Sequence, residues 1–317
     1  MRFRLLAVVA VAFAVVGVVT AGAGASGKDH PSVCTGTSGA PGVLSGTYYS
    51  DVIVQGVCAV NGGAANVHGN LVVSPGSALL AIFALNDVAG TGTSSLTVGR
   101  SIYVQNGGSL ALGCEPNFSP CADDPNQTGG TLTGSNHVYG DLVSAQPLGV
   151  LLHATTINGN VFEGGGGGGV NCTPTGIFTL FQSPVFSDYE DNTIGGNLVI
   201  NGLQTCWLGS LRNTVGGSVI DTNNTMADPD AGEVLQNTVR GNLVCLNNSP
   251  AVQFGDSGAS PNVVGGYAIG QCGFGVLSPD PNYPNGDGTG GPQPISVKSD
   301  QGHHHDDHGH RRDHYHF

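Results

Sequence analysis

Charged side chains are scarce in this sequence of 317 residues. Asp, Glu, Lys and Arg together make up 10% of the chain, and its only lysines are Lys28 and Lys298. The net charge of −13 excludes the basic stripe that a nucleic-acid-binding surface needs, so we expect no nucleic acid as a partner. So few charges suit a repeat surface covered by Ser, Thr, Asn and Gly.

Long hydrophobic runs are missing too, apart from one at the N-terminus. The apolar run Leu5–Val19 follows two arginines and precedes Ala-Gly-Ala at residues 23–25, a small-residue cleavage site. The run is short for a membrane span. We interpret residues 1–25 as a signal peptide, expect a mature chain from about Ser26, and predict export with no membrane span after cleavage. An uncleaved anchor is the alternative.

No Cys-x-x-Cys occurs, which argues against a zinc or redox site built on the thiols. Eight cysteines in an exported chain instead predict disulfides. Stacked turns of a repeat would bring sequence-local cysteines together, although other connectivities stay open. The expected pairs are Cys34 with Cys58, Cys114 with Cys121, Cys172 with Cys206, and Cys245 with Cys272.

No window shows a sustained helical period, and a short phrase recurs instead. It consists of an aliphatic residue, any residue, glycine, a small polar residue, and an aliphatic residue that opens a β-rich run. Its clearest copy is Ile194-Gly195-Gly196-Asn197-Leu198. The nine copies begin at Tyr48, Val67, Val98, Val138, Ile157, Ile194, Val215, Val239 and Val263.

The copies are 19, 31, 40, 19, 37, 21, 24 and 24 residues apart, and we interpret the step of 40 as about two units. Such a period indicates a solenoid, in which no repeat can bury its apolar face alone. Glycine allows the chain to bend between two strands. We therefore expect Ile194, Leu198 and Ile200 to point inward.

The length and pattern of the repeat from about Cys34 to Leu277 resemble the right-handed parallel β-helix of secreted bacterial proteins, including the pectate-lyase-like group. The resemblance implies an all-β, single-domain solenoid of about nine to eleven turns, and it rests on no catalytic signature. The repeat is also similar to the shorter one of polymer-forming bactofilins. The predicted divisions are the domain at 26–277, a Pro/Gly-rich linker at 278–302 and a tail at 303–317.

Insertions into the repeat are expected near 113–131 and 164–191, where the steps are long. The first holds two cysteines and predicts a disulfide-closed loop. The glycines at 164–169 predict a flexible bulge, and the lysine that a phosphate-binding loop needs does not follow them. The aromatic stretch at 177–191 is interpreted as a flap packed on the flank of the repeat, with a sugar-stacking platform as the alternative.

An asparagine recurs just before the phrase. Stacked asparagines at one corner can hydrogen-bond along the column, as ladders do in cross-β arrays. We expect a structural ladder from Asn66, Asn136, Asn192, Asn213, Asn237 and Asn262.

Two acidic clusters are the candidates for catalysis, because a polysaccharide hydrolase needs paired carboxylates. Both precede a copy of the phrase at similar distances, so they could align on one side. Solvated loop carboxylates are the simpler interpretation. The clusters are Asp188, Glu190 and Asp191, and Asp228, Asp230 and Glu233.

Other catalytic patterns have less support. Arg212 and Arg240, the nearby bases, stand at different offsets from the phrase and are expected on different sides. No Gly-x-Ser-x-Gly elbow occurs. His68 and Tyr139 occupy the same outward slot of the phrase, so we expect His68 to be a surface residue.

The C-terminal tail is rich in histidine. Neutral imidazole is a good ligand for Zn²⁺, Ni²⁺ and Cu²⁺, so this run predicts metal chelation. A pH-sensitive charged tail and an end without a role are the alternatives. The histidines are His303, His304, His305, His308, His310, His314 and His316.

Three functions are consistent with these patterns. The first is an exported, non-catalytic β-helix scaffold that acts as a surface, cell-wall or adhesion module on polysaccharide, with a metal-binding tail and no required cofactor. The second is a carbohydrate-active hydrolase or lyase that uses the acidic clusters. The third is a metal-sequestering protein whose solenoid presents the tail.

Overall fold

The computed structural model describes residues 30–81, 94–113, 136–254, 262–273 and 296–297. The predicted signal peptide, the loop between Cys114 and Cys121 and the histidine tail lie outside these residues. So does the predicted linker, except for Ser296–Val297, which form the short strand β27.

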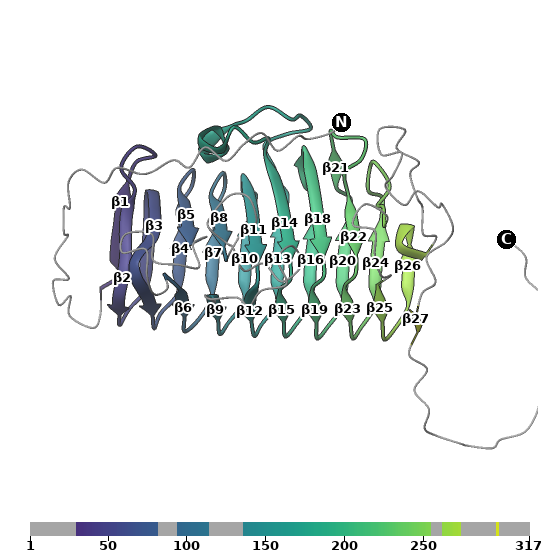
Figure 1. Cartoon of the computed structure of the whole chain (residues 1–317), viewed down its shortest axis with the longest axis horizontal. Helices are drawn as coiled ribbons and strands as arrows, with labels where there is room; N and C mark the ends of the chain where they lie inside the picture. The colour runs from purple at the N-terminus through teal and green to yellow at the C-terminus, as the bar shows by residue number, and fades with distance from the viewer. Residues whose placement is uncertain (1–29, 82–93, 114–135, 255–261, 274–295, 298–317) are drawn as a thin grey trace, which may run out of the picture.

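The described chain is almost entirely β, and its strands pair in parallel in one large sheet. They form three series, in which each strand pairs with its counterpart in the next repeat. Figure 1 shows the strands side by side along the long axis. The arrangement is consistent with a parallel β-helix.

The first series holds β1 (Ser32–Gly36), the start of β3 (Val52–Val67), β4 (Leu71–Val73), β7 (Ile102–Val104), β10 (Leu142–Ala145), β13 (Val161–Gly164), β16 (Leu198–Asn201), β20 (Val219–Thr222), β24 (Leu243–Leu246) and β26 (Ala268–Gly270). The second holds the start of β2 (Gly42–Tyr48), the middle of β3, β5 (Ala78–Ala81), β8 (Ser109–Leu112), β11 (Gly149–His153), β14 (Phe186–Glu190), β18 (Trp207–Leu211) and β22 (Glu233–Leu235).

The third series holds the ends of β2 and β3, β6 (Leu96–Val98), β9 (Asn136–Val138), β12 (Thr155–Ile157), β15 (Thr193–Ile194), β19 (Thr214–Val215), β23 (Thr238–Val239), β25 (Val263–Val264) and β27. Two further strands, β17 (Gln204–Thr205) and β21 (Thr225–Met226), pair only with each other.

The recurring phrase sets the register of the third series. The first residues of the first eight copies, from Tyr48 to Val239, are register partners in order. The ninth copy is shifted by one residue, because Val239 pairs with Val264 and not with Val263. The step of 40 residues was misread as two units. Val98 pairs directly with Val138, so it is one repeat that carries an insertion.

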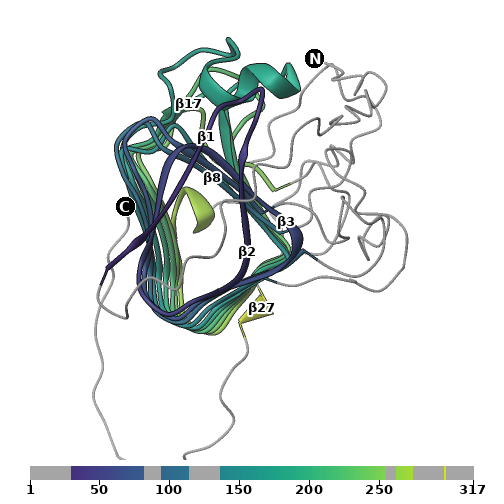
Figure 2. The ribbon, with the colours of Figure 1, turned by 90° about the vertical axis from the view of Figure 1, so that its left-hand side faces the viewer.

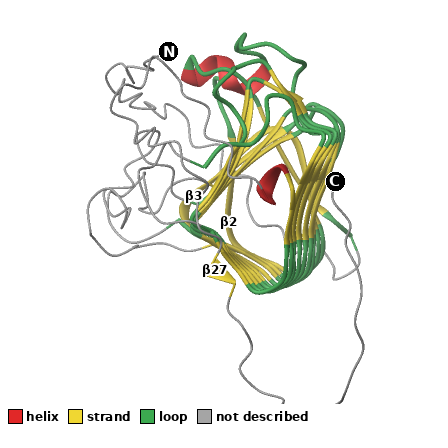
Figure 3. Ribbon diagram, turned by 90° about the vertical axis from the view of Figure 1, so that its right-hand side faces the viewer, coloured by secondary structure: helices red, strands yellow, loops and turns green. Residues whose placement is uncertain are grey.

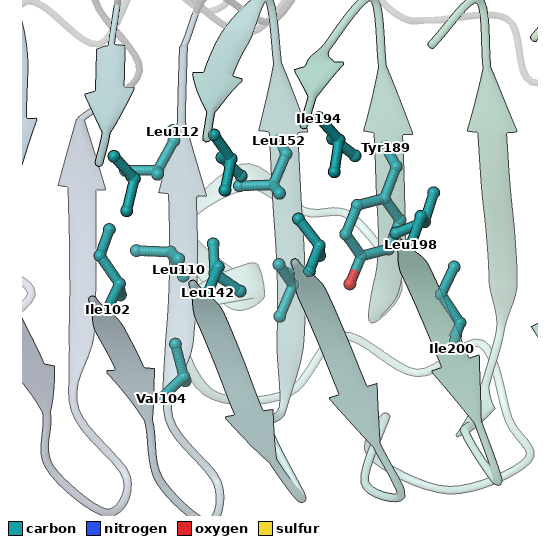
Figure 4. Close-up of a cluster of buried hydrophobic side chains, with 14 of the residues drawn as sticks. Ile102, Val104, Leu110, Leu112, Leu142, Leu152, Tyr189, Ile194, Leu198 and Ile200 are labelled. Atoms are coloured by element: carbon teal, nitrogen blue, oxygen red, sulfur yellow. The ribbon is translucent and has the colours of Figure 1, made fainter. Parts of the chain in front are cut away.

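The strands of the stack enclose a common interior (Figure 2), and the aliphatic residues of the phrase are buried in it. Ile194, Leu198 and Ile200 are at most 1% exposed, so their predicted inward direction is confirmed. Figure 4 shows them among leucines and valines that come from neighbouring repeats. Burying one such side chain is worth about 1.5–3 kcal/mol. Alternation with a period of two sends every second residue inward, which explains why strands of three or four residues suffice.

The asparagine ladder is confirmed from Asn192 to Asn262, whereas the buried Asn136 bonds Leu96 N and Ala81 O and no asparagine among the described residues. Asn213 donates from Nδ2 to Tyr189 O (2.7 Å) and Asn237 Oδ1 (3.0 Å), and its own Oδ1 accepts from Asn192 N (3.1 Å) and Nδ2 (3.0 Å). Asn237 bonds Asn262 in the same way. Asn66 was wrongly included. Its register partners are Thr47 and Thr97, so it lies one residue out of the column.

The glycine run after β13 is packed, contrary to the flexible bulge that we expected. Residues 165–169 all have positive φ. Gly167 N donates to Pro147 O at 2.8 Å, and Gly169 N donates to Gln204 O at 3.0 Å. A Cβ on Gly166 would lie 2.1 Å from Pro147 O, so only glycine fits this close approach.

Three of the expected disulfides are present: Cys34–Cys58, Cys172–Cys206 and Cys245–Cys272. The fourth pair lies outside the described residues. We expected stacking of the repeats to bring the cysteines of each pair together. The bonded cysteines are close, but they are not register partners. Cys245 pairs in register with Gly270, and its disulfide instead holds the 3₁₀ helix η2 (Gln271–Gly273). Figure 3 shows η2 in the opening at the C-terminal end of the stack.

The aromatic insertion forms the flap that the sequence predicted. It contains the 3₁₀ helix η1 (Gly176–Phe181), in which Phe178 is buried. Ile177 and Phe181 pack on Leu80 and Ala111, which face outward from the second series. A small pocket between the flap and these strands is lined mainly by apolar side chains. Within the described ranges, no helix has the length and hydrophobicity that a membrane span requires.

Candidate functional site

A charged cluster lies at the end of the second-series strands. His153 ends β11, Glu190 ends β14 and is its register partner, and Asp191 follows at the corner. Arg212 occupies the corresponding corner after β18, where its N–H donates to Leu235 O. Asp191 and Arg212 have φ of 56° and 54°. This conformation is unfavourable for a residue with Cβ, and it aims both side chains at the same point.

The guanidinium of Arg212 binds both carboxylates. Its Nε donates to Asp191 Oδ1 at 2.9 Å, one terminal nitrogen donates to Asp191 Oδ2 at 3.0 Å, and the same nitrogen contacts Glu190 Oε1. His153 Nε2 lies 3.1 Å from Asp191 Oδ2, and Nδ1 lies 3.9 Å from Glu190 Oε2. His153 is 1% exposed, so the cluster is closed on its inner side.

Electrostatics keep Arg212 charged in this cluster. Partial burial lowers the pKa of Arg212, but its hydrogen bonds and charge interactions with Asp191 and Glu190 outweigh that and raise the pKa above its ordinary value. Arg212 is therefore a permanent cation between two carboxylates.

The same cluster offers ligand atoms for a metal ion. One atom each from His153, Glu190 and Asp191 lie within 4.8 Å of one another, and imidazole with carboxylates suits Zn²⁺. However, Arg212 already uses both carboxylates and supplies the positive charge that a metal would bring. The donor set therefore fits an ion pair better than a resident metal.

The other candidate carboxylates separate into two groups. Asp188 and Glu233 are both register partners of Gly209, so they lie on either side of it in one outward column. The expected alignment of the two clusters is thus correct for this pair. Asp228 and Asp230 lie in the turn before β22, where Asp230 N donates to Asp228 Oδ1 at 3.1 Å.

Aromatic rings cover the space between Asp188 and Glu233. A Cβ on Gly209 would lie 2.2 Å from the far edge of the Trp207 ring, so the indole lies over this glycine. Trp207 packs edge-on against Phe186 at 6.0 Å between centroids, and Phe186 packs against Phe178 at 5.6 Å. Trp207, Phe186 and Glu233 are half-buried at the outer face here, and Phe178 and Asp188 are buried beside them.

Two interior carboxylates were missed by the sequence analysis. Glu163 and Asp221 point inward from β13 and β20 and are 0% exposed. Glu163 accepts from Ser187 Oγ at 2.8 Å and from the Tyr189 hydroxyl at 2.7 Å, while Asp221 accepts from Asn224 Nδ2. The sequence pattern could have identified both residues, because each occupies the inward position two residues after a buried valine.

Burial raises the pKa of both interior carboxylates to about 7. For Glu163 the hydrogen bonds from Tyr189 and Ser187 oppose the shift and the charge of Asp221 adds to it. For Asp221 the hydrogen bonds with Asn224 and Asn248 oppose it. These groups are enclosed in the core, so they bear on stability and not on a substrate.

The remaining predicted residues do not join the cluster. His68 is exposed as expected, and its ring stacks on Tyr49 at 5.3 Å. Tyr139 shares the outward slot and stacks on His137 at 4.1 Å. Arg212 binds the first acidic cluster, whereas Arg240 follows Val239 in the third series, so their separation is confirmed. The histidines from His303 to His316 lie outside the described residues.

Comparison with protein-family models, with curated proteins and with solved structures found no match to this chain.

Proposed function

We propose that the chain is an exported right-handed parallel β-helix of about nine to eleven turns, with pectate-lyase-like architecture. It acts as a non-catalytic, surface- or wall-associated binding module for polysaccharide. Three disulfides among the described residues are compatible with an extracellular protein. The net charge of −13 argues for an uncharged ligand over a polyanion.

The observation that carries this proposal is the position of Trp207. Its ring covers Gly209, the residue between Asp188 and Glu233. A glycosidase needs that space for the scissile bond, since its acid and base act from either side of it. An aromatic ring there suits stacking on a sugar. Glu190 and Asp191 support the same conclusion, because Arg212 holds both in an ion pair.

A panel of insoluble and soluble polysaccharides tests this function by binding and by product release on the same samples. We expect retention on at least one polysaccharide without release of sugar, and loss of that retention in Trp207→Ala. Leu180→Ala, at an exposed position of the flap, is the matched control and should still bind. Retention that is unchanged in Trp207→Ala would remove the proposed surface.

A carbohydrate-active enzyme is the second candidate, favoured by the alignment of Asp188 with Glu233. Their strands are two spacings apart, about 9.6 Å at the backbone, close to the separation of about 6.5–9.5 Å between the carboxyl groups of inverting glycosidases. If sugar release occurs and disappears in both Asp188→Asn and Glu233→Gln, the enzyme replaces the binding module.

The tail adds metal chelation to this proposal. Its seven histidines, His303 to His316, would bind Zn²⁺, Ni²⁺ or Cu²⁺ without any contribution from the β-structure. Titration of Zn²⁺ or Cu²⁺ into the full-length protein and into residues 1–300 should show strong binding only in the first. Equal binding by both would end this part of the proposal. If the protein bound metal through the tail but was not retained on any polysaccharide, the third function, metal sequestration, would be favoured.

A further inference from the structure

The outward face of the first series carries an unbroken row of apolar side chains, which we call the apolar stripe. Consecutive members are register partners on neighbouring strands. The members are Val33, Ile53, Val72, Tyr103, Val143, Phe162, Val199, Ile220, Val244 and Ile269.

These side chains point away from the core. From β3 to β24 the stripe residue of each strand lies between two buried neighbours, as Tyr103 does between Ile102 and Val104. Val33 is 52% exposed, Tyr103 41% and Ile269 41%. The interior does not require apolar residues at these positions, since a sheet with one solvated face normally has polar residues there.

The outward positions of the other two series differ from the apolar stripe. The outward column of the third series is mostly polar and includes Thr156, Thr193, Thr214 and Thr238 as successive partners. In the second series, the outward Leu80 and Ala111 are apolar, and η1 covers them. The apolar stripe is the longest outward apolar row of the described strands. Its members Val33, Tyr103, Phe162 and Ile269 are exposed, and the other six are half-buried.

The stripe is also uncharged in a strongly acidic chain. Along one side run the register partners Ala145, Gly164, Asn201, Thr222 and Leu246. The aspartates on the other side, Asp51 and Asp141, are held by hydrogen bonds at 2.7 Å from the backbone N–H of Asn70 and Asn160. A second copy with a net charge of −13 meets the least repulsion on such a face.

The size of the stripe suits an interface. Nine strand spacings give a length of about 43 Å, and three alternating positions give a width of about 14 Å. Two such surfaces would bury about 1,200 Å² in total, which reaches the lower bound for a stable protein–protein interface.

We propose that the apolar stripe is the contact between two copies of this chain. A uniform apolar row is complementary to itself, so a two-fold axis between Val143 and Phe162 brings the two stripes face to face. The two sheets then pack as in a β-sandwich, about 10 Å apart. The dimer leaves the Trp207 surface, on the second series, accessible in both copies. The inference rests on register and exposure and does not depend on polysaccharide binding.

Sedimentation of the full-length protein across a concentration series tests the proposal. We expect twice the monomer mass at micromolar concentration. Val143→Lys with Val199→Lys places like charges against each other across the two-fold axis and should raise the dimer dissociation constant about a hundredfold or more. Thr193→Lys with Thr214→Lys adds the same charge to the third series and should leave the constant within about threefold. A monomeric wild type, or an equal effect of both pairs, would overturn the proposal.

A cross-link keeps the test decisive if the lysine variants do not fold. A photo-reactive phenylalanine analogue in place of Phe162 should yield a covalent dimer, with the cross-linked peptides lying within residues 136–222. Cross-links that map to the second or third series, or none at all, would contradict the interface. If the stripe variants stay monomeric like the wild type yet lose retention on a polysaccharide, the stripe binds that polymer and not a second copy.

Discussion

The Tyr189 hydroxyl donates a hydrogen bond of 2.7 Å to the carboxylate of Glu163 in the middle of the aliphatic core. Figure 4 shows the tyrosine among aliphatic side chains of the core. Burial raises the pKa of Tyr189 well above its ordinary value, so this phenol remains a donor at every pH at which the fold survives. The carboxyl of Glu163 is therefore a titratable group in the interior of the fold.

Stability should therefore depend on pH through Glu163 and Asp221. Their pKa values rise from the ordinary 4.5 and 3.8 to about 7 in the folded state. Well below pH 3.8, the lower of the two ordinary pKa values, both states hold the protons and the contribution is complete. Between about pH 4 and 7 the unfolded chain has lost protons that the folded chain keeps, so stability falls as pH rises and levels off above pH 7. The loss is on the order of 3 kcal/mol per group.

The variant Glu163→Gln with Asp221→Asn isolates this effect. It cannot ionise, so its free energy of unfolding relative to wild type should increase from pH 4.5 to pH 7 and then stay constant. Urea unfolding at five pH values measures the difference. Asp228→Asn, a change in the turn before β22, is the control and should track the wild type. A difference that is independent of pH would show that the interior carboxyls titrate normally.

Removal of one ladder amide should be costly. Asn213→Ala leaves Tyr189 O without its side-chain donor and two N–H groups of Asn192 without their acceptor, and Asn237 Oδ1 keeps only the backbone N–H of residue 213, all in the core. Each unsatisfied buried group costs about 1–3 kcal/mol, so we expect a loss of about 3 kcal/mol or more in the free energy of unfolding.

Asn158→Ala provides the comparison, because this residue is part of the outward slot and its side-chain oxygen contacts only the exposed ring of His137. Its cost should stay below about 1 kcal/mol. If both substitutions cost the same in chemical unfolding, the ladder would not be a source of stability.

Removal of Arg212 should convert the ion-pair cluster into a metal site. Arg212→Gly suits the corner because glycine adopts a φ of 54° without strain. Without the guanidinium, His153, Glu190 and Asp191 keep ligand atoms within 4.8 Å, and the two carboxylates lose the arginine that binds them. We expect about one additional equivalent of Zn²⁺ in calorimetry relative to wild type, at a cost of about 1–3 kcal/mol in stability.

Arg240→Gly, which removes an arginine in the third series, should change neither quantity by a measurable amount. The metal expectation fails if Arg212→Gly binds the same number of zinc ions as wild type, and also if the added equivalent persists when His153 is replaced by alanine.

The environment of a residue could be predicted from sequence where its position in the phrase decides that environment. The inward direction of Ile194 and Leu198 and the ladder through Asn192 follow from a repeat with period two along each strand, and the three disulfides join cysteines that are neighbours in the sequence order. The environment of a residue was predicted wrongly where an inserted residue shifts the pattern. Asn66 and Val263 were each assigned one position out of register, because a one-residue shift exchanges inward and outward and leaves the composition unchanged.

The charged cluster could not be found from sequence alone. His153 and Arg212 are 59 residues apart, and both contact Asp191 because His153 ends β11 while Arg212 follows β18 at a corner with positive φ. The spacing from the phrase identified Arg212 as near the acidic residues. It did not predict the direction in which the side chain points. The apolar stripe had a usable signal, since residues such as Val143 and Val199 follow a buried leucine directly, where a polar residue was expected.

Disulfide trapping across the third series tests the repeat register most directly. Thr193 and Thr214 are outward register partners on adjacent strands, about 4.8 Å apart, within disulfide reach of about 4.4–6.8 Å between Cα atoms. Thr193→Cys with Thr214→Cys should form a bond that mass mapping detects, and Thr193→Cys with Thr238→Cys, two strands apart, should not. A bond in the second pair and none in the first would contradict the stacking of successive phrases on which this account depends.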